Sequence, residues 1–208
     1  IVRGVEEAIG RDLPAAARYR ELGHELLPSM KPRLVAIGGL SGTGKSTVAQ
    51  ALAPGLPGVC GARLLRTDTI RKRAAGVDPR ASLPETSYTP AARAAVYRAL
   101  ADRAAAAVAA GAAVVADATF REPAARAAIA RAAPRGVFQG VWLRTTAEVR
   151  IARVAARHGD ASDATPAVAE AQTEPTNLGA SWRVVDAARP AVELAAAVRR
   201  ILLDEEPA

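Results

Sequence analysis

The sequence predicts an α/β fold in three layers, a five-stranded parallel sheet with helices on both faces. Two observations lead to this prediction. From Arg33 onward, short apolar runs alternate with helical stretches, which is the pattern of successive strand–helix–strand units. In addition, the glycine-rich segment Gly39–Ser46 stands directly between the first apolar run and the first helical stretch, where a tight loop must join a strand to a helix.

The expected elements follow in chain order. A short N-terminal helix over residues 15–27 is opened by Asp12 and Pro14, and the prolines within residues 28–32 end it. The expected strands are the apolar runs Leu34–Ile37, Ala62–Arg66, Ala112–Ala116, Gly136–Leu143 and Trp182–Val185. The expected helices are Lys45–Ala53, Thr69–Ala75, Pro90–Ala110, Glu122–Ala132, Thr146–Arg157, Thr165–Gln172 and Pro190–Leu203.

One main domain is expected over residues 33–208, preceded by residues 1–32 as a helix and linker. The chain starts at Ile1 and its single methionine is Met30, which indicates a fragment of a longer product. The first helix is then either packed on the core or the tail of an upstream domain. Residues 76–89, with two prolines, are expected to form a mobile loop, and a lid is expected around residues 157–165.

Composition excludes several classes of protein. Of the 208 residues 50% are hydrophobic, which is enough for one substantial core, yet no segment has the length and purity of a membrane span. Nothing near the N-terminus has the pattern of a secretion signal. A single cysteine, Cys60, allows no internal disulfide, which suits a cytoplasmic protein.

The formal charge of +7 comes almost entirely from arginine and has two interpretations. A basic surface could follow a nucleic-acid backbone, or a composition so rich in alanine and arginine could reflect a GC-rich genome. Aromatic residues make up only 3% of the chain, which leaves few platforms for stacking bases. The second interpretation is therefore favoured, and nucleic acid is the less favoured partner.

Residues Gly39–Ser46 match the phosphate-loop pattern G-x-x-x-x-G-K-[ST] at every fixed position. Glycines let backbone N–H groups turn toward phosphate oxygens, and the N-terminus of the following helix adds partial positive charge. Lys45 is expected to reach the β- and γ-phosphates of ATP, and the Ser46 hydroxyl to bind Mg²⁺. An ordinary glycine-rich turn is the alternative, and the position between strand and helix argues against it.

The end of the third strand helps to choose between classes of nucleotide-binding protein. GTPases need an N-K-x-D segment to read the base, and this sequence has none. The strand ends in a single acid, Asp117, which can hold Mg²⁺ through water, but no adjacent glutamate is present to activate a hydrolytic water. The sequence therefore favours phosphoryl transfer over ATP hydrolysis.

Asp68 follows the second strand as Asp117 follows the third. Ligands of open α/β sheets bind outside the carboxyl ends of the strands, so both acids should converge on the phosphate loop. Asp68 is expected to be the base that orients an acceptor hydroxyl, with an N-cap of a helix starting at Thr69 as the alternative. Arg71, one turn later, could hold an anionic acceptor. A solvated basic face is the interpretation for the other cations of this segment, Arg66, Lys72 and Arg73.

Three arginines, Arg150, Arg153 and Arg157, fall on one face of the helix after the fourth strand. That helix runs into a polar stretch that could close over ATP. Cations from such a lid would neutralise charge on the transferring phosphoryl group. A charged helix surface is the alternative, and Arg157 is favoured over Arg150 for the functional role.

The segments just described resemble those of the small P-loop kinases related to polynucleotide kinase, zeta toxin and chloramphenicol phosphotransferase. They are Gly38–Thr47, Arg66–Lys72, Val115–Phe120 and Arg153–Asp163. The resemblance extends over about residues 33–203 and implies the three-layer P-loop NTPase fold of nucleoside-kinase-like proteins. It is closest to AAA-type kinases that follow an aminoglycoside-phosphotransferase-like half in bifunctional bacterial proteins, which implies a covalently linked upstream domain.

The resemblance also implies a role for each matching residue. Nucleotide contacts would come from Gly39, Ser41, Gly42, Thr43, Gly44, Lys45, Ser46 and Thr47 and from the lid residues Arg153 and Arg157. Ser46 would hold Mg²⁺, and Asp117 would either belong to the metal shell or be a structural acid. Lys45, Asp68 and Arg157 would act in catalysis, while Asp68, Arg71 and Arg126 would contact the acceptor. Residues 186–190 would flank adenine. Residues 76–89 match no substrate signature of these kinases, so the resemblance leaves the acceptor open.

The sequence thus predicts an ATP- and Mg²⁺-dependent kinase that phosphorylates a hydroxyl of a small molecule or of a nucleic-acid end. A regulatory ATP-binding module or slow ATPase attached to another domain is the alternative from a different class. A nucleic-acid 5′-hydroxyl kinase is a third hypothesis, kept by the basic charge.

Overall fold

The computed structural model describes residues 17–18, 32–56, 61–78, 81–134, 137–156 and 162–203. The chain divides into two units, residues 1–31 and 32–208. In the first unit only Ala17 and Arg18 are described, both helical, and the rest of the expected helix over residues 15–27 lies outside the described residues. All that follows concerns the second unit.

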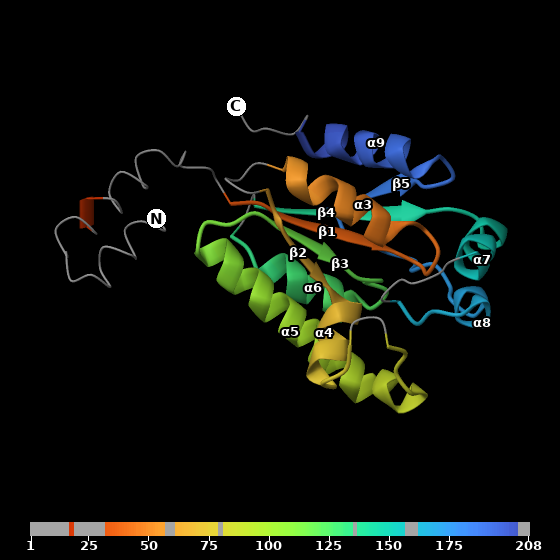
Figure 1. Cartoon of the computed structure of the whole chain (residues 1–208). Helices are drawn as coiled ribbons and strands as arrows, with labels where there is room; N and C mark the ends of the chain where they lie inside the picture. Colours follow the sequence, from red (N-terminus) through yellow and green to blue (C-terminus); the bar gives the residue numbers. More distant parts are fainter. Residues whose placement is uncertain are drawn as a thin grey trace. The chain divides into compact units, whose positions relative to one another are not determined.

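Five strands form one parallel sheet in the order β2-β3-β1-β4-β5 (Figure 1). The strands are β1 Leu34–Gly39, β2 Arg63–Arg66, β3 Val114–Asp117, β4 Phe138–Arg144 and β5 Trp182–Asp186. Each overlaps one of the apolar runs of the sequence, because a strand buried on both faces needs apolar side chains at successive positions. The predicted α/β fold with a five-stranded parallel sheet is confirmed.

Helices connect the strands and cover both faces of the sheet (Figure 1). They are α3 Lys45–Leu52, α4 Thr67–Ala74, α5 Pro90–Ala109, α6 Pro123–Arg131, α7 Ala147–Ala155, α8 Pro166–Glu170 and α9 Ala191–Leu203, with the short 3₁₀ helices η1 Ala53–Gly55 and η2 Glu85–Tyr88. Within the described ranges, none of these helices combines the length and the apolar character that crossing a membrane requires.

Alternate residues of each central strand enter two separate apolar cores. Leu34 and Ala36 of β1 pack on one face under α5 and α6, whereas Val35 and Ile37 pack on the other face under α3 and α9. The same alternation divides β3, whose Val114 joins the first core. This period of two fixes the register, since a slip of one residue would exchange the two cores.

The segment from β2 to α5 differs from the expectation in two ways. Helix α4 begins at Thr67 with Arg66 as its N-cap, so Asp68 lies in the first helical turn and is not the N-cap considered above. Residues 76–89 are not a plain loop, because η2 lies within them and Leu83 and Tyr88 are hydrogen-bonded to Asp163. Residues 79–80 lie outside the described ranges.

The carboxyl ends of β2, β3 and β1 meet at one edge of the sheet. Asp117 is in register with Ile37 of β1 on one side and with Arg66 of β2 on the other. The chain leaves β1 toward α3 on one face and leaves β3 toward α6 on the opposite face. Neighbouring strands that continue to opposite faces open a crevice between them, where ligands of such sheets bind.

Two glycines of the central strands make room for tryptophan rings. A Cβ on Gly140 of β4 would lie 2.5 Å from the Trp182 ring, and one on Gly38 of β1 would lie 2.8 Å from it. Trp182 in turn contacts Phe120, with ring centroids 5.3 Å apart. The sheet is therefore closely packed against aromatic rings at this point.

Gly140→Ala should lower the free energy of unfolding by about 1–3 kcal/mol, because the added methyl overpacks a site bounded by a rigid ring. Urea unfolding followed by circular dichroism measures the change. Gly55→Ala is the control, since its Cβ would meet only the guanidinium end of Arg199 at 3.4 Å. Equal effects of the two substitutions would contradict the packing argument.

Candidate functional site

The loop between β1 and α3 has the backbone geometry of a phosphate-binding loop. Gly42 and Gly44 have φ angles of 87° and 90°, in the region that favours glycine. A Cβ on Gly42 would also collide with the carbonyl group of Arg150 in α7, so the loop packs closely on that helix. Gly44 is the N-cap of α3 and provides no side-chain cap, which leaves N–H groups of the first turn to bind an anion.

Lys45 and Thr43 both bond to the loop itself. The Lys45 ammonium donates to the Leu40 carbonyl over 2.8 Å, and the buried Thr43 hydroxyl donates to the same carbonyl over 2.9 Å. Thr43 thereby stabilises the turn. Lys45 folds back over it, where it also acts electrostatically on Asp117.

Gln172, 131 residues from Ser41 in the sequence, binds the phosphate loop through two hydrogen bonds. Its side-chain carbonyl accepts the Ser41 backbone N–H over 2.7 Å, and its amide donates to the Ser41 hydroxyl over 3.0 Å. The two bonds use both ends of the amide, so they fix the orientation of the side chain as well as its position. Nothing in the sequence pattern pointed to this residue.

Asp117 occupies the centre of the site at the end of β3. It accepts a hydrogen bond from Arg66 over 3.2 Å and is hydrogen-bonded to the Ser46 side chain. Burial raises the pKa of Asp117 above its ordinary value and the charge of Asp68 adds to this, although Lys45, Ser46 and Arg66 act in the opposite direction. Arg66 is thus a partner of Asp117 and not part of a solvated face.

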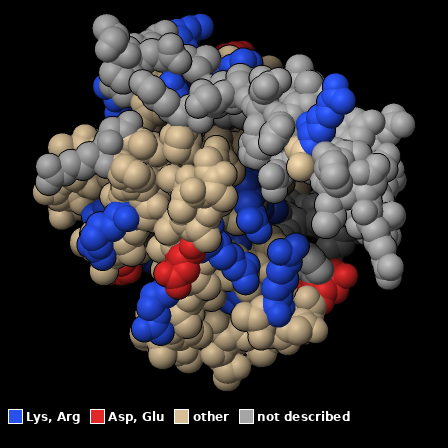
Figure 2. Space-filling model, turned by 90° about the vertical axis from the view of Figure 1, so that its left-hand side faces the viewer, with Lys and Arg blue, Asp and Glu red and all other residues tan. Residues whose placement is uncertain are grey.

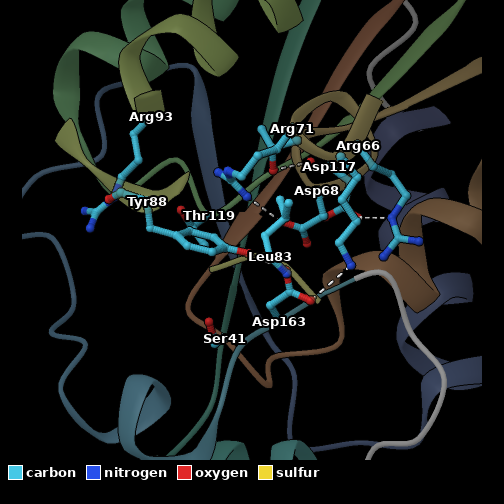
Figure 3. A network of polar contacts seen from close by, with 12 residues as sticks. Ser41, Arg66, Asp68, Arg71, Leu83, Tyr88, Arg93, Asp117, Thr119 and Asp163 are labelled. Atoms are coloured by element: carbon cyan, nitrogen blue, oxygen red, sulfur yellow. Dashed lines mark hydrogen bonds and ion pairs between the residues drawn. The ribbon is translucent and has the colours of Figure 1, made fainter. Parts of the chain in front are cut away.

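Asp68 projects from the first turn of α4 toward the same edge of the sheet (Figure 3). The Arg71 guanidinium donates to its Oδ1 over 3.0 Å and lies 4.6 Å above the centroid of the Tyr88 ring. Arg71 Nε is buried without a hydrogen-bond partner. The expected convergence of Asp68 and Asp117 on the phosphate loop is found, since Asp68, Lys45 and Ser46 all act on Asp117.

Asp163 bonds to α4 and to the segment of Leu83 and Tyr88, both at least 75 residues away in the sequence (Figure 3). Its carboxylate accepts hydrogen bonds from the Lys72 ammonium over 3.0 Å, from the Leu83 backbone N–H over 3.3 Å and from the Tyr88 hydroxyl. Only 1% of Lys72 is exposed, so this lysine is buried and not part of the solvated face predicted from the sequence. Asp163 belongs to the expected lid, of which residues 157–161 lie outside the described ranges.

A buried tyrosine holds the turn that follows Asp117. The Tyr97 hydroxyl accepts the Phe120 backbone N–H over 3.0 Å and is bonded to the Thr119 hydroxyl over 2.9 Å. Phe120 has a φ of 48°, a conformation that non-glycine residues rarely adopt. The Thr119 carbonyl accepts the Gly39 N–H over 3.3 Å, so the turn also touches the start of the phosphate loop.

Arg126, predicted to contact the acceptor, bonds to backbone carbonyls of three residues. Its guanidinium donates to the carbonyls of Phe120, Arg121 and Asn177 over 2.8, 2.6 and 2.6 Å, and the residue is 5% exposed. A guanidinium satisfied by three backbone carbonyls ties chain segments together. These bonds give Arg126 a structural role, and its contact with an acceptor stays a prediction.

The arginines of α7 have different environments. Arg150 is 4% exposed and donates to the Ala169 carbonyl over 2.7 Å, so it is a buried link to α8 and lies neither on a charged surface nor in a lid. Arg153 donates over 2.9 Å to the carbonyl of Ala187, in the loop predicted to flank adenine. Its nucleotide contact stays a prediction, and Arg157 lies outside the described residues.

Asp163 gives the site a measurable dependence on pH. Burial would raise its pKa, but the hydrogen bonds from Tyr88, Lys72 and the Leu83 amide outweigh burial and hold the pKa below its ordinary value of 3.8. Its stabilising contribution is therefore complete above 3.8 and is lost as the pH falls through the lower value of the folded protein.

Asp163→Asn should lower the free energy of unfolding by about 3 kcal/mol at neutral pH, because it takes the carboxylate from a buried ammonium. The difference between the variant and the wild type should narrow as the pH falls below 3.8, which urea unfolding at a series of pH values measures. Glu170→Gln, at an exposed carboxylate of α8, is the control and should have little effect. A difference that is constant with pH would contradict the assignment.

Residues 34–177 match the family described as AAA domain. No curated protein is similar to this chain in sequence. Among solved structures, a sugar kinase from Janibacter sp. HTCC2649 is 25% identical, with a TM-score of 0.59, over 85% of this chain and 96% of that one.

Two further structures show the same fold at lower identity. A gluconokinase from Sinorhizobium meliloti 1021 is 23% identical, with a TM-score of 0.55, over 85% of this chain and 99% of that one. An APS kinase from Mycobacterium tuberculosis, in complex with AMPPNP and APS, is 20% identical, with a TM-score of 0.53, over 83% of this chain and 98% of that one.

Proposed function

Because the chain belongs to the AAA domain family, we propose that it is an ATP- and Mg²⁺-dependent kinase that transfers the γ-phosphoryl group of ATP to a hydroxyl group. The observation that carries this proposal is the meeting of Lys45, Asp117 and Asp68 at one edge of the sheet. A phosphotransferase needs a cation for the phosphoryl oxygens, an acid on the metal side and a carboxylate for the acceptor. The three residues supply one of each.

The donor side would bind ATP through the loop and the first turn of α3. The backbone from Gly39 to Thr47 supplies N–H groups, and the Gly44 N-cap directs the helix dipole toward the phosphates. Lys45 would exchange the Leu40 carbonyl for β- and γ-phosphate oxygens. The kinase structures with the same fold support this assignment, one of them in complex with AMPPNP.

The residues around Ser46 fit a magnesium ion that arrives with the nucleotide. Ser46 and Asp117 are already hydrogen-bonded and offer oxygen ligands. Across the described ranges no group of three or more His, Cys, Asp or Glu side chains could enclose a metal. That fits Mg²⁺, which is held by one or two protein oxygens together with phosphates and water. When bound, the ion would neutralise charge on the phosphates.

The acceptor side is built around Asp68 and Arg71. Among the described residues Asp68 is hydrogen-bonded through Oδ1, and its second oxygen would accept the proton of an acceptor hydroxyl. Arg71 orients the carboxylate, and its positive charge would attract an anionic acceptor. The names of similar structures include a gluconokinase and an APS kinase, whose substrates both carry hydroxyl groups and negative charge, in line with a cation at this position.

A nucleic-acid end is the less supported acceptor. Basic side chains predominate over acidic ones on the face shown in Figure 2. That face lies at the amino ends of the strands, whereas the phosphate loop is at their carboxyl ends (Figure 1). The charges of this face therefore give no support to a nucleic-acid acceptor at Asp68.

Asp68→Asn should lower the rate of phosphoryl transfer by about 10²–10⁴-fold, because the amide cannot accept the acceptor proton. The affinity for ATP should change less than about twofold, since Asp68 faces the acceptor. Steady-state kinetics and calorimetric titration with ATP measure the two quantities. Asp102→Asn, on the exposed face of α5, is the control. Equal losses of rate and ATP affinity would overturn the role of Asp68.

The acceptor can be found by incubating the protein with γ-labelled ATP and sugars, sugar acids, aminoglycosides, nucleosides or oligonucleotides. Transfer of label to one class supports the kinase and names its acceptor. Steady ATP hydrolysis without transfer to any of them would favour the regulatory module or slow ATPase. The upstream phosphotransferase-like domain stays a prediction.

A further inference from the structure

Residues 162–174, called the strap from here on, touch both halves of the proposed active site. At one end Gln172 bonds to Ser41 in the phosphate loop, and at the other end Asp163 bonds to Lys72, Leu83 and Tyr88. The first contact belongs to the ATP side and the second to the acceptor side. The sequence suggested no connection between them.

The middle of the strap is held by several hydrogen bonds. Its centre is the helix α8, whose N-cap Thr165 accepts the Val168 N–H over 3.3 Å. The buried Arg150 of α7 donates to Ala169 over 2.7 Å. Beyond Gln172, Glu174 accepts the Trp142 indole N–H over 2.8 Å, which fastens the strap to β4. These bonds give the short helix between the two ends of the strap a defined conformation.

The acceptor end of the strap cannot separate from α4 at low cost. Lys72 is buried, so withdrawal of Asp163 would leave a buried ammonium without this carboxylate. Lys72 follows Arg71 directly, and Tyr88, the second partner of Asp163, lies under the Arg71 guanidinium. Arg71 in turn pairs with Asp68. A displacement of Asp163 would therefore alter the position of Asp68 in two ways, through Lys72 in α4 and through the contact of Tyr88 with Arg71.

We infer that the strap couples occupation of the phosphate loop to the geometry of the acceptor side, with Gln172 and Asp163 as its two positioning residues. Phosphates bound by the loop reorient Ser41, and the two hydrogen bonds to Gln172 then displace the strap. The displacement of Asp163 at the other end of the strap changes the positions of Tyr88 and α4. Neither residue touches the reacting atoms. The inference deepens the proposed kinase function, and it rests on that function for its meaning in catalysis.

Amide hydrogen exchange of the full chain, with and without Mg²⁺·AMPPNP, tests the coupling without any acceptor. In the wild type, the nucleotide should slow exchange in the phosphate loop and also, by about tenfold, in residues 82–88, whose Leu83 N–H is bonded to Asp163. Protection of the phosphate loop proves that the nucleotide is bound. A wild-type protein that protects the loop and not residues 82–88 would overturn the inference.

Substitutions at the two ends separate coupling from local stability. Gln172→Ala should keep the basal exchange rate of residues 82–88 and abolish its response to the nucleotide, because only the loop end is cut. Tyr88→Phe keeps the ring under Arg71 and loses the bond to Asp163, so it should weaken the response without unfolding the segment. Glu170→Gln, exposed on the strap itself, should respond as the wild type does. A full response in Gln172→Ala would overturn the inference.

Kinetics with the acceptor identified by the screen give an independent measurement. Asp163→Asn should raise the acceptor KM about tenfold and leave the ATP KM within about twofold, because the displaced groups lie on the acceptor side. Equal effects on both KM values would contradict a positioning role. A protein that phosphorylates no acceptor would defeat the proposed function, while the exchange experiment would still decide whether the strap couples the two sides.

Discussion

A buried carboxylate at the end of β3 is the constraint on which the site depends. Asp117 lies in register between β1 and β2, and its partners Ser46 and Arg66 come from the phosphate loop and from the strand that leads to Asp68. Burial disfavours the charged form and raises the pKa of Asp117. Buried carboxylates of this kind are frequent at functional sites. A cation brought by the nucleotide would offset the cost of burying the Asp117 charge.

Three arginines among the described residues link backbone segments. Arg126 ties the turn after β3 to residue 177, Arg150 ties α7 to α8, and Arg153 ties α7 to the loop after β5. A guanidinium has five donors in a fixed fork, which suits clusters of carbonyls at loop ends as well as it suits phosphate. The presence of arginines in a sequence that contains a phosphate loop is therefore weak support for contacts between those arginines and a ligand.

Features that depend on neighbouring residues in the sequence could be predicted from the sequence. The sheet and the phosphate loop follow from apolar runs and glycines, and the meeting of Asp68 with Asp117 follows because parallel strands end at one edge. The partners of Asp163 and Gln172 could not be predicted, since they lie 91 residues away at Lys72 and 131 residues away at Ser41. A lysine on a basic helix is ordinarily solvated, and only the tertiary fold shows that Lys72 is buried.

Lys45 and Ser41 of the phosphate loop already have hydrogen-bond partners, which changes what binding of ATP must do. Lys45 donates to Leu40, and Ser41 is held by Gln172 through two hydrogen bonds. Phosphates would therefore exchange existing hydrogen bonds for stronger charge-assisted ones, and the gain is the difference between the two sets. An exchange of partners moves the groups that lose them. The Ser41–Gln172 contact joins the phosphate loop to the strap, whose other end is Asp163. The contacts that hold the loop in its conformation therefore also connect it to the acceptor side.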